Sequence, residues 1–272
     1  MDTRNAIAIA AASFIRAASF IGAMAGLGYT HVANAADAPA TAGTIAASAP
    51  VEVQINLCTG PTKIAKALGL KAKSDRREVW YFDTPGLTLM GKGLVVRLRV
   101  SDGDDELTLK FADQNCAAIP ARLLPKGAGK CEYDLHGASL NGAVSLEQTL
   151  SAPTLRVLRD TSRQPAEAVN SSLNQAQITF LREQFGVWPL PADIRRLGPA
   201  TLKTYRSKFE PFVVESWNLA TSERFVEISQ KTTYGKADAV KSALTARLAS
   251  AGIEVCGDQS SQALPKLKAL SH

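Results

Sequence analysis

Two arginines lie on the same face of a short alternating stretch of this sequence. In residues 94–100, LVVRLRV, Arg97 and Arg99 alternate with apolar side chains, and a period of two is typical of a half-buried β-strand. A guanidinium is always charged, and its planar fork of donors matches the oxygens of a phosphate or a carboxylate. Two such groups side by side indicate either an anion site or a set of internal salt bridges.

Charges recur on one face of the other alternating stretches, which are residues 51–57, 106–111, 131–137, 202–219 and 223–231. Besides the two arginines, this charged face carries the bases Lys110, Arg206 and Lys208 and the acids Glu52, Glu132, Asp134, Glu215 and Glu227. The opposite faces are apolar, so other elements must cover them. In an open sheet the charged face would be in water. In a closed sheet it would line a lumen, where each cation requires a carboxylate or an anionic ligand.

The rest of the chain supplies helices that can cover the apolar faces. Helical spacing predicts a helix over 61–69, two or three helices within 144–186 broken near Pro153 and Pro165, and an amphipathic helix over 236–252. Residues 77–82 and 87–90 are predicted to be extended, and Asp83 is expected to cap the turn between them. The predicted fold class is therefore α+β.

The ends of the chain suggest an exported protein. Arg4 and Arg16 precede an apolar run that ends in Ala-Asn-Ala at 33–35, which predicts a signal peptide over residues 1–35. The alternative, a membrane anchor, needs a longer apolar run. Residues 36–50 are expected to form a flexible leader, 51–265 the folded domain and 266–272 a tail. The expected location is the periplasm, with no stable membrane insertion after cleavage.

Charge and cysteine content narrow the classes of partner. The formal net charge is +6 for the 272 residues, which favours anionic ligands weakly and argues against a dedicated nucleic-acid binder. An even number of cysteines in an exported chain favours disulfides over zinc. Of the three pairings, the favoured one joins Cys116 to Cys131 and Cys58 to Cys256, and free buried thiols are the alternative. His136 is expected in a surface position or loop.

Residues 81–100, YFDTPGLTLMGKGLVVRLRV, resemble the signature of CYTH domains, the triphosphate tunnel metalloenzymes, in which a Y-[YF]-D-T-P-x-L turn precedes a strand ending in R-x-R. The resemblance continues in order through T-L-K at 108–110, C-E-Y-D at 131–134, the basic strand around Arg206 and V-E-I at 226–228. It spans roughly residues 50–265. The resemblance implies a closed antiparallel β-tunnel with helices outside, in which basic residues bind a triphosphate or polyphosphate and acidic residues hold Mg²⁺ or Mn²⁺.

Applied to this chain, the resemblance assigns phosphate binding to Arg97, Arg99, Lys110, Arg206 and Lys208, and metal binding to Glu52, Glu132 and Glu227. The chain also departs from the family. At the family's E-x-E-x-K motif it has Glu52, Gln54 and Asn56, and Ser229 follows Glu227 where paired carboxylates are common. An amide in place of a carboxylate removes a charge and a strong ligand for Mg²⁺. Metal-dependent catalysis is therefore expected to suffer more than anion binding.

These observations predict an exported tunnel protein that binds inorganic polyphosphate or an organic triphosphate, with a weakened metal-dependent triphosphatase or polyphosphatase activity. The alternative is a non-catalytic polyanion-binding or scaffolding module. A lipocalin-like barrel for an apolar ligand is disfavoured, because the alternation places the arginines on the face opposite the aliphatic side chains. The oligomeric state is left open.

Overall fold

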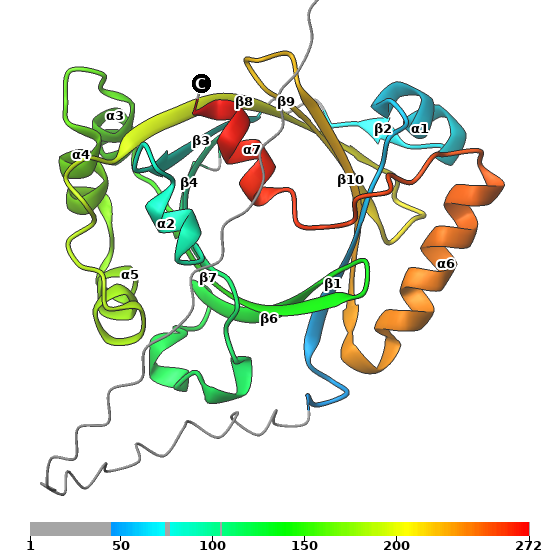
Figure 1. The fold of residues 1–272 in the computed structure, drawn as a ribbon, viewed down its shortest axis with the longest axis horizontal. Helices are drawn as coiled ribbons and strands as arrows, with labels where there is room; N and C mark the ends of the chain where they lie inside the picture. Colours follow the sequence, from blue (N-terminus) through cyan, green and yellow to red (C-terminus); the bar gives the residue numbers. More distant parts are fainter. Residues whose placement is uncertain (1–44, 74–76, 104, 272) are drawn as a thin grey trace, which may run out of the picture. The chain divides into compact units, whose positions relative to one another are not determined.

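Among the described residues, nine β-strands close into a barrel, and a tenth short strand extends one edge (Figure 1). The computed structural model describes residues 45–73, 77–103 and 105–271, all within one compact unit, Gly43–His272. The expected signal peptide and leader residues 36–44 lie outside the described residues. The strands are β1 Pro50–Asn56, β2 Lys71–Ala72, β3 Arg77–Asp83, β4 Leu94–Val100, β5 Glu106–Phe111, β6 Gly129–His136, β7 Ser139–Thr149, β8 Arg195–Arg206, β9 Val213–Asn218 and β10 Arg224–Thr233.

Pairing of β9 with β8 closes the ring. The order of strands is β8-β3-β4-β5-β7-β6-β1-β10-β9, and β9 then pairs back with β8 over Thr201–Tyr205. β2 pairs with the last residues of β8. Neighbouring strands are antiparallel except for β1 and β6, which are parallel. The expected closed tunnel with outer helices is confirmed.

Five of the described helices form two outer groups, α7 is an inner element, and the short α2 packs against β3 and β4. Their bounds are α1 Pro61–Leu68, α2 Thr88–Gly91, α3 Ala152–Arg159, α4 Pro165–Ser172, α5 Gln175–Phe180 with a π-helical turn Leu181–Phe185, α6 Ala237–Ser250 and α7 Ala263–Leu270. α3, α4 and α5 cover the outward faces of β4, β5 and β7, and α1 and α6 cover those of β1, β9 and β10. Figure 1 shows α7 within the ring of strands. α7 also spans the boundary expected between residues 265 and 266.

Two segments differ from the expected secondary structure. Residues 88–91 form the short helix α2 and are not extended. The carboxylate of Asp83 accepts hydrogen bonds from the N–H groups of Leu89 and Met90 at 2.9 Å each, so its predicted capping role is confirmed and extends to a helix start. Residues 144–149 belong to β7 and are not helical. This strand is buried on both faces over residues 142–146, which removes the period of two from the sequence.

All four cysteines are paired as expected, Cys58 with Cys256 and Cys116 with Cys131. The first disulfide joins the end of β1 to the segment after α6, and the second connects β6 to the loop that follows β5. Within the described part of the chain, no helix has the length and apolar character needed to cross a bilayer.

Replacing Cys58 and Cys256 with serine should lower the free energy of unfolding by about 2 kcal/mol more than replacing Cys116 and Cys131. The reason is that the entropy which a disulfide removes from the unfolded chain grows with the logarithm of the length of the loop that it closes. The sequence separations are 198 and 15 residues. Urea unfolding of the two double variants, followed by tryptophan fluorescence, measures the difference. Equal losses would contradict this entropic origin.

Candidate phosphate and metal site in the lumen

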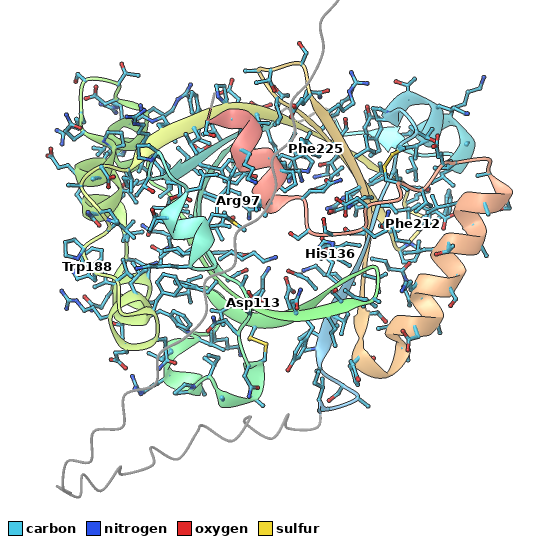
Figure 2. The ribbon with its side chains drawn as sticks, viewed as in Figure 1. Arg97, Asp113, His136, Trp188, Phe212 and Phe225 are labelled. Carbon is cyan, nitrogen blue, oxygen red and sulfur yellow. A yellow bond between two sulfur atoms is a disulfide. The ribbon has the colours of Figure 1, made fainter. Side chains whose placement is uncertain are left out.

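Most of the charged face predicted from the sequence lines the lumen of the barrel, and Arg206 and Lys208 are exposed beyond it. Strand register places Arg97 opposite Thr108 across β4 and β5, and Glu52 opposite Asp134 across β1 and β6. The alternate residues of the same strands lie in the outer apolar cores. Figure 2 shows Arg97 within the ring of strands. Closure of the sheet therefore brings together charges that come from strands far apart in sequence.

Arg97 and Arg99 share a single carboxylate. Glu106 Oε1 lies 4.0 Å from Arg97 Nη2 and 3.6 Å from Arg99 Nη1. Arg97 and, to a smaller extent, burial lower the pKa of Arg99 to about 10, which reports the repulsion between the two guanidinium groups. The Nε atoms of both arginines are buried without a hydrogen-bond partner among the described residues. This region of the lumen therefore has donors and positive charge to offer to an anion.

The other three predicted phosphate ligands lie in different environments. Lys110 Nζ is in the lumen, 2.5 Å from Asp134 Oδ2, so it has the internal carboxylate partner that was the alternative to ligand binding. Arg206 is exposed at the end of β8, opposite Lys71. Lys208 is exposed in the next turn, with Nζ 4.9 Å from the ring centre of Phe209. The assignment of Arg206 and Lys208 to phosphate binding stays a prediction.

A cluster of carboxylates lies on the β1–β6 side of the lumen. Glu52, Glu132 and Asp134 each offer one oxygen, and these three oxygens lie within 4.8 Å of one another. Burial raises the pKa of Glu52, and the positive charge of Lys231 lowers it in part. Three hard oxygen donors of this kind fit Mg²⁺ or Mn²⁺. The cluster contains two of the three predicted metal ligands, Glu52 and Glu132. Its third member is Asp134 and not the predicted Glu227.

Glu227 lies in a second acidic group. It is directly opposite Glu215 in the β9–β10 pair. Burial raises the pKa of Glu227 to about 7, while the charge of Lys266 acts in the opposite direction and that of Glu215 adds to the increase. Two carboxyl groups and one ammonium group thus share an enclosed space, where an unpaired charge would be costly and a protonated Glu227 is favoured.

Lys266, on α7, is a lumen residue that the sequence analysis missed. The residue is 7% exposed, and its Nζ lies 4.2 Å from the ring centre of Trp217. Burial lowers its pKa, and Glu227 and Glu215 partly offset this effect. Eight residues of mixed apolar and basic type carry no signal that distinguishes a helix inside a barrel from one on its surface. Lys266 therefore had no recognisable motif.

Apolar residues of α7 fill part of the lumen. Leu267 and Ala269 pack in a cluster with Val79, Leu202 and Trp217. Val79 is opposite Arg99 across β3 and β4, and Leu202 is opposite Trp217 across β8 and β9. Residues directly opposite in a pair share a face of the sheet, so this cluster is on the lumen side. One part of the lumen is therefore apolar and occupied, and the other part is charged.

Asn56, at the position of the family's motif lysine, supports the segment that leads to α7. Its Nδ2 donates to the carbonyl oxygens of Asp258 at 3.1 Å and Ser260 at 2.8 Å, and its backbone N–H donates to Gln259 Oε1 at 2.9 Å. The Asn56 side chain acts only as a donor here, since its Oδ1 is buried without a partner among the described residues, and the short neutral amide serves both carbonyl groups without burying a charge. The residue that departs from the motif has a structural role in this chain.

The expectation for His136 was wrong. The residue ends β6 and is only 7% exposed, on the face of the strand that also carries Glu132 and Asp134. Figure 2 shows it inside the ring. Burial lowers its pKa, so the neutral imidazole is favoured.

Comparison with known proteins gives matches at the level of structure. A putative adenylyl cyclase from Hippeastrum, described as having a dominant triphosphatase activity, has a TM-score of 0.52 and 18% identity, with 78% of this chain and 93% of that chain covered. A putative adenylate cyclase from Bacillus halodurans has a TM-score of 0.52 and 13% identity, with 78% and 95% covered. No protein-family model and no curated protein matches the sequence. The chain therefore shares the closed-barrel fold of these two proteins.

Replacing Glu227 with glutamine should weaken the pH dependence of stability. Because the folded pKa of about 7 exceeds the ordinary value of 4.5, the folded state binds more protons between these pH values. The free energy of unfolding contributed by Glu227 therefore falls as the pH rises through this window. Glutamine should remove up to about 3 kcal/mol of this fall. Urea unfolding at about pH 5 and about pH 8 measures it, with exposed Glu223→Gln as control. A pH dependence that is the same in Glu227→Gln and in the wild type would contradict the raised pKa of Glu227.

Proposed function

We propose that the lumen binds the phosphate chain of inorganic polyphosphate or of an organic triphosphate, and that a divalent cation assists its hydrolysis. The observation that carries this proposal is the arginine pair. Arg97 and Arg99 have one carboxylate between them, and both keep buried donors without partners among the described residues. A chain of phosphates offers several oxygens at the spacing of guanidinium forks, and its negative charge relieves the repulsion between the two arginines.

Strand register relates this anion region to the carboxylate cluster, because Thr108 is opposite both Arg97 and Glu147. Lys110 joins β5 to Asp134 of the cluster, and Lys130 Nζ lies 2.8 Å from Glu147 and 3.7 Å from Glu132. Alternating cations and carboxylates therefore line one continuous wall. A phosphate chain bound by the arginines could place its other phosphates along this wall, where lysines can contact their oxygens.

The carboxylate cluster is the place where a divalent cation would bind. Glu52, Glu132 and Asp134 would supply oxygen ligands, and the ion would neutralise charge that develops on the phosphoryl oxygens. Lysines already contact two members of the cluster: Lys110 pairs with Asp134, and Lys130 and Lys231 pair with Glu132. Because the ion must compete with these ammonium groups, its affinity should be modest. This supports a slow hydrolase more than a fast one.

Export to the periplasm is part of the proposal. Both disulfides join elements of the folded unit, and such bonds persist in oxidising compartments. Free nucleoside triphosphates are scarce outside the cytoplasm, so inorganic polyphosphate is the favoured ligand.

The Arg97→Ala, Arg99→Ala double variant should lose at least about 90% of phosphate release from tripolyphosphate in the presence of Mg²⁺ or Mn²⁺, because removal of an electrostatic contact to the transferred group typically costs tenfold or more. Malachite green detects the released phosphate. Arg156→Ala, on the exposed face of α3, is the matched control and should retain full activity. Equal rates in the double variant and the wild type would contradict the proposal.

Calorimetric titration of tripolyphosphate separates the two functions predicted from the sequence. The non-catalytic module would be supported, in place of the hydrolase, by two results together. The wild type binds tripolyphosphate but releases no phosphate, and the double arginine variant does not bind it. Absence of both binding and release would contradict both functions.

Asp134→Asn should weaken Mn²⁺ binding at least about tenfold, because it removes one of three clustered charges and a strong oxygen ligand. Electron paramagnetic resonance of free Mn²⁺ measures the affinity without reference to activity. Glu167→Gln, on the surface of α4, is the control. An Asp134→Asn variant with wild-type affinity would place the metal elsewhere.

A further inference from the structure

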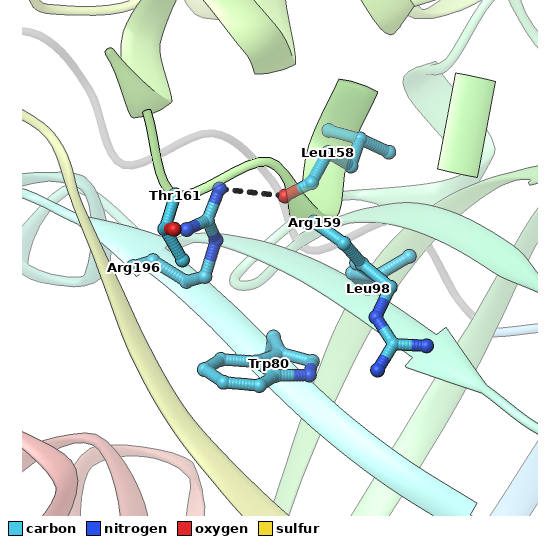
Figure 3. A pocket seen from close by; sticks show the side chains of 6 residues that line it. All are labelled: Trp80, Leu98, Leu158, Arg159, Thr161 and Arg196. Atoms are coloured by element: carbon cyan, nitrogen blue, oxygen red, sulfur yellow. Dashed lines mark hydrogen bonds between the residues drawn. The ribbon is translucent and has the colours of Figure 1, made fainter. Parts of the chain in front are cut away.

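A cavity of about 370 Å³ lies outside the barrel, between the end of α3 and the strands beneath it (Figure 3). The residues that line it are Trp80, Leu98, Leu158, Arg159, Thr161 and Arg196. Trp80 is opposite Leu98 in the β3–β4 pair, and Leu98 belongs to the outer core. The cavity is therefore on the face of the sheet that points away from the lumen, and the proposed phosphate site does not use it.

Arg196 is held at the cavity by the end of α3. Its Nη2 donates to the carbonyl oxygen of Leu158 at 2.7 Å and to that of Asp160 at 3.2 Å. These bonds satisfy helix carbonyls and fix the guanidinium group beside the indole (Figure 3). The Nε of Arg196 is buried without a hydrogen-bond partner in the described part of the chain. The arginine therefore brings a fixed positive charge to an apolar cavity.

Two further donors lie at the same cavity. The indole Nε1 of Trp80 is buried without a partner among residues 45–73, 77–103 and 105–271. Arg159 is half exposed, and its Nη2 lies 3.8 Å from Glu78 Oε2, which is a long and weak surface pair. Figure 3 shows the guanidinium of Arg159 on the side of the indole that carries the nitrogen. A carboxylate or sulfonate in this space would meet both positive charges.

We propose that this cavity binds a small aromatic monoanion, a carboxylate or a sulfonate with one to three rings. The ring would lie against the indole of Trp80 and the apolar side chains of Leu98 and Leu158, where flat π-surfaces pack well. The anionic group would lie between Arg159 and Arg196. The volume is at the lower end of the range for small-molecule sites. An inorganic phosphate would leave the apolar walls uncovered, so it fits this cavity less well than an aromatic anion does.

Titration with 1-anilinonaphthalene-8-sulfonate tests the proposal on the full folded protein. Direct excitation of the probe reports binding, and calorimetry reports the number of sites. One saturable site is expected. Arg159→Gln should weaken binding at least fivefold, and Thr161→Phe, which adds bulk at the cavity and removes no charge, should do the same. Arg156→Gln lies on the same helix, does not line the cavity, and should bind as the wild type does.

Three results would overturn the proposal. The first is equal weakening by Arg156→Gln and Arg159→Gln, which would mean general attraction to a basic helix. The second is equally tight binding of uncharged N-phenyl-1-naphthylamine, which would mean that the anionic group is not recognised. The third is displacement of the probe by tripolyphosphate, which would place the probe in the lumen. Circular dichroism and thermal unfolding confirm that each variant is folded, so loss of probe binding in the folded Thr161→Phe variant places the probe in the cavity, and the Arg159→Gln result reports recognition of its anionic group.

Discussion

Closure of the sheet by the pairing of β9 with β8 is the constraint on which the chemistry of this protein depends. Before closure, each strand has an apolar face that helices can cover and a charged face that water can solvate. Closure removes most of that water, so every charge must find a partner inside. The observed pairings of Arg97 and Arg99 with Glu106 and of Lys110 with Asp134 follow from this requirement, and the charge of Lys266 acts on the pKa of Glu227 in the same enclosed space. The site is a consequence of the topology.

The lumen is divided, and α7 makes the division. Its apolar residues pack against inward side chains of β3, β8 and β9, so this region has no room or polarity for a phosphate chain. At the border, Lys266 extends the positive charge of the arginine pair toward Glu215 and Glu227. An isolated helix of eight residues is not stable in water. The position of α7 therefore depends on its contacts in the lumen and on the segment that Asn56 holds.

Much of this architecture could be predicted, because alternation and helical spacing report which face of an element is buried. They identified β1, β5 and β6, the helices α1 and α6, and the shared face of the two arginines, whereas the closed lumen came from the resemblance to CYTH domains; the disulfide pairing preferred from the cysteine positions was correct. Alternation and helical spacing are uninformative where burial is not one-sided. β7 is buried on both faces over part of its length, and α2 is too short to show a period. The neighbours of Glu227 were unpredictable for another reason, since Lys266 reaches it from a distant helix and only the fold brings the two together.

The charges in the lumen also explain why anion binding should be more robust than metal binding. At the level of Gln54 and Ser229, which are opposite each other across β1 and β10, the wall carries no charge. The remaining carboxylates have lysine neighbours, so a divalent ion gains attraction from the acids and loses it to the ammonium groups. At Arg97 and Arg99 two cations share one acid, so a phosphate chain gains more attraction from the guanidinium groups than it loses to the carboxylate. In addition, a bound polyphosphate would bring its own negative charge and oxygen ligands to the metal. The ion should therefore bind more tightly together with the phosphate chain than to the protein alone.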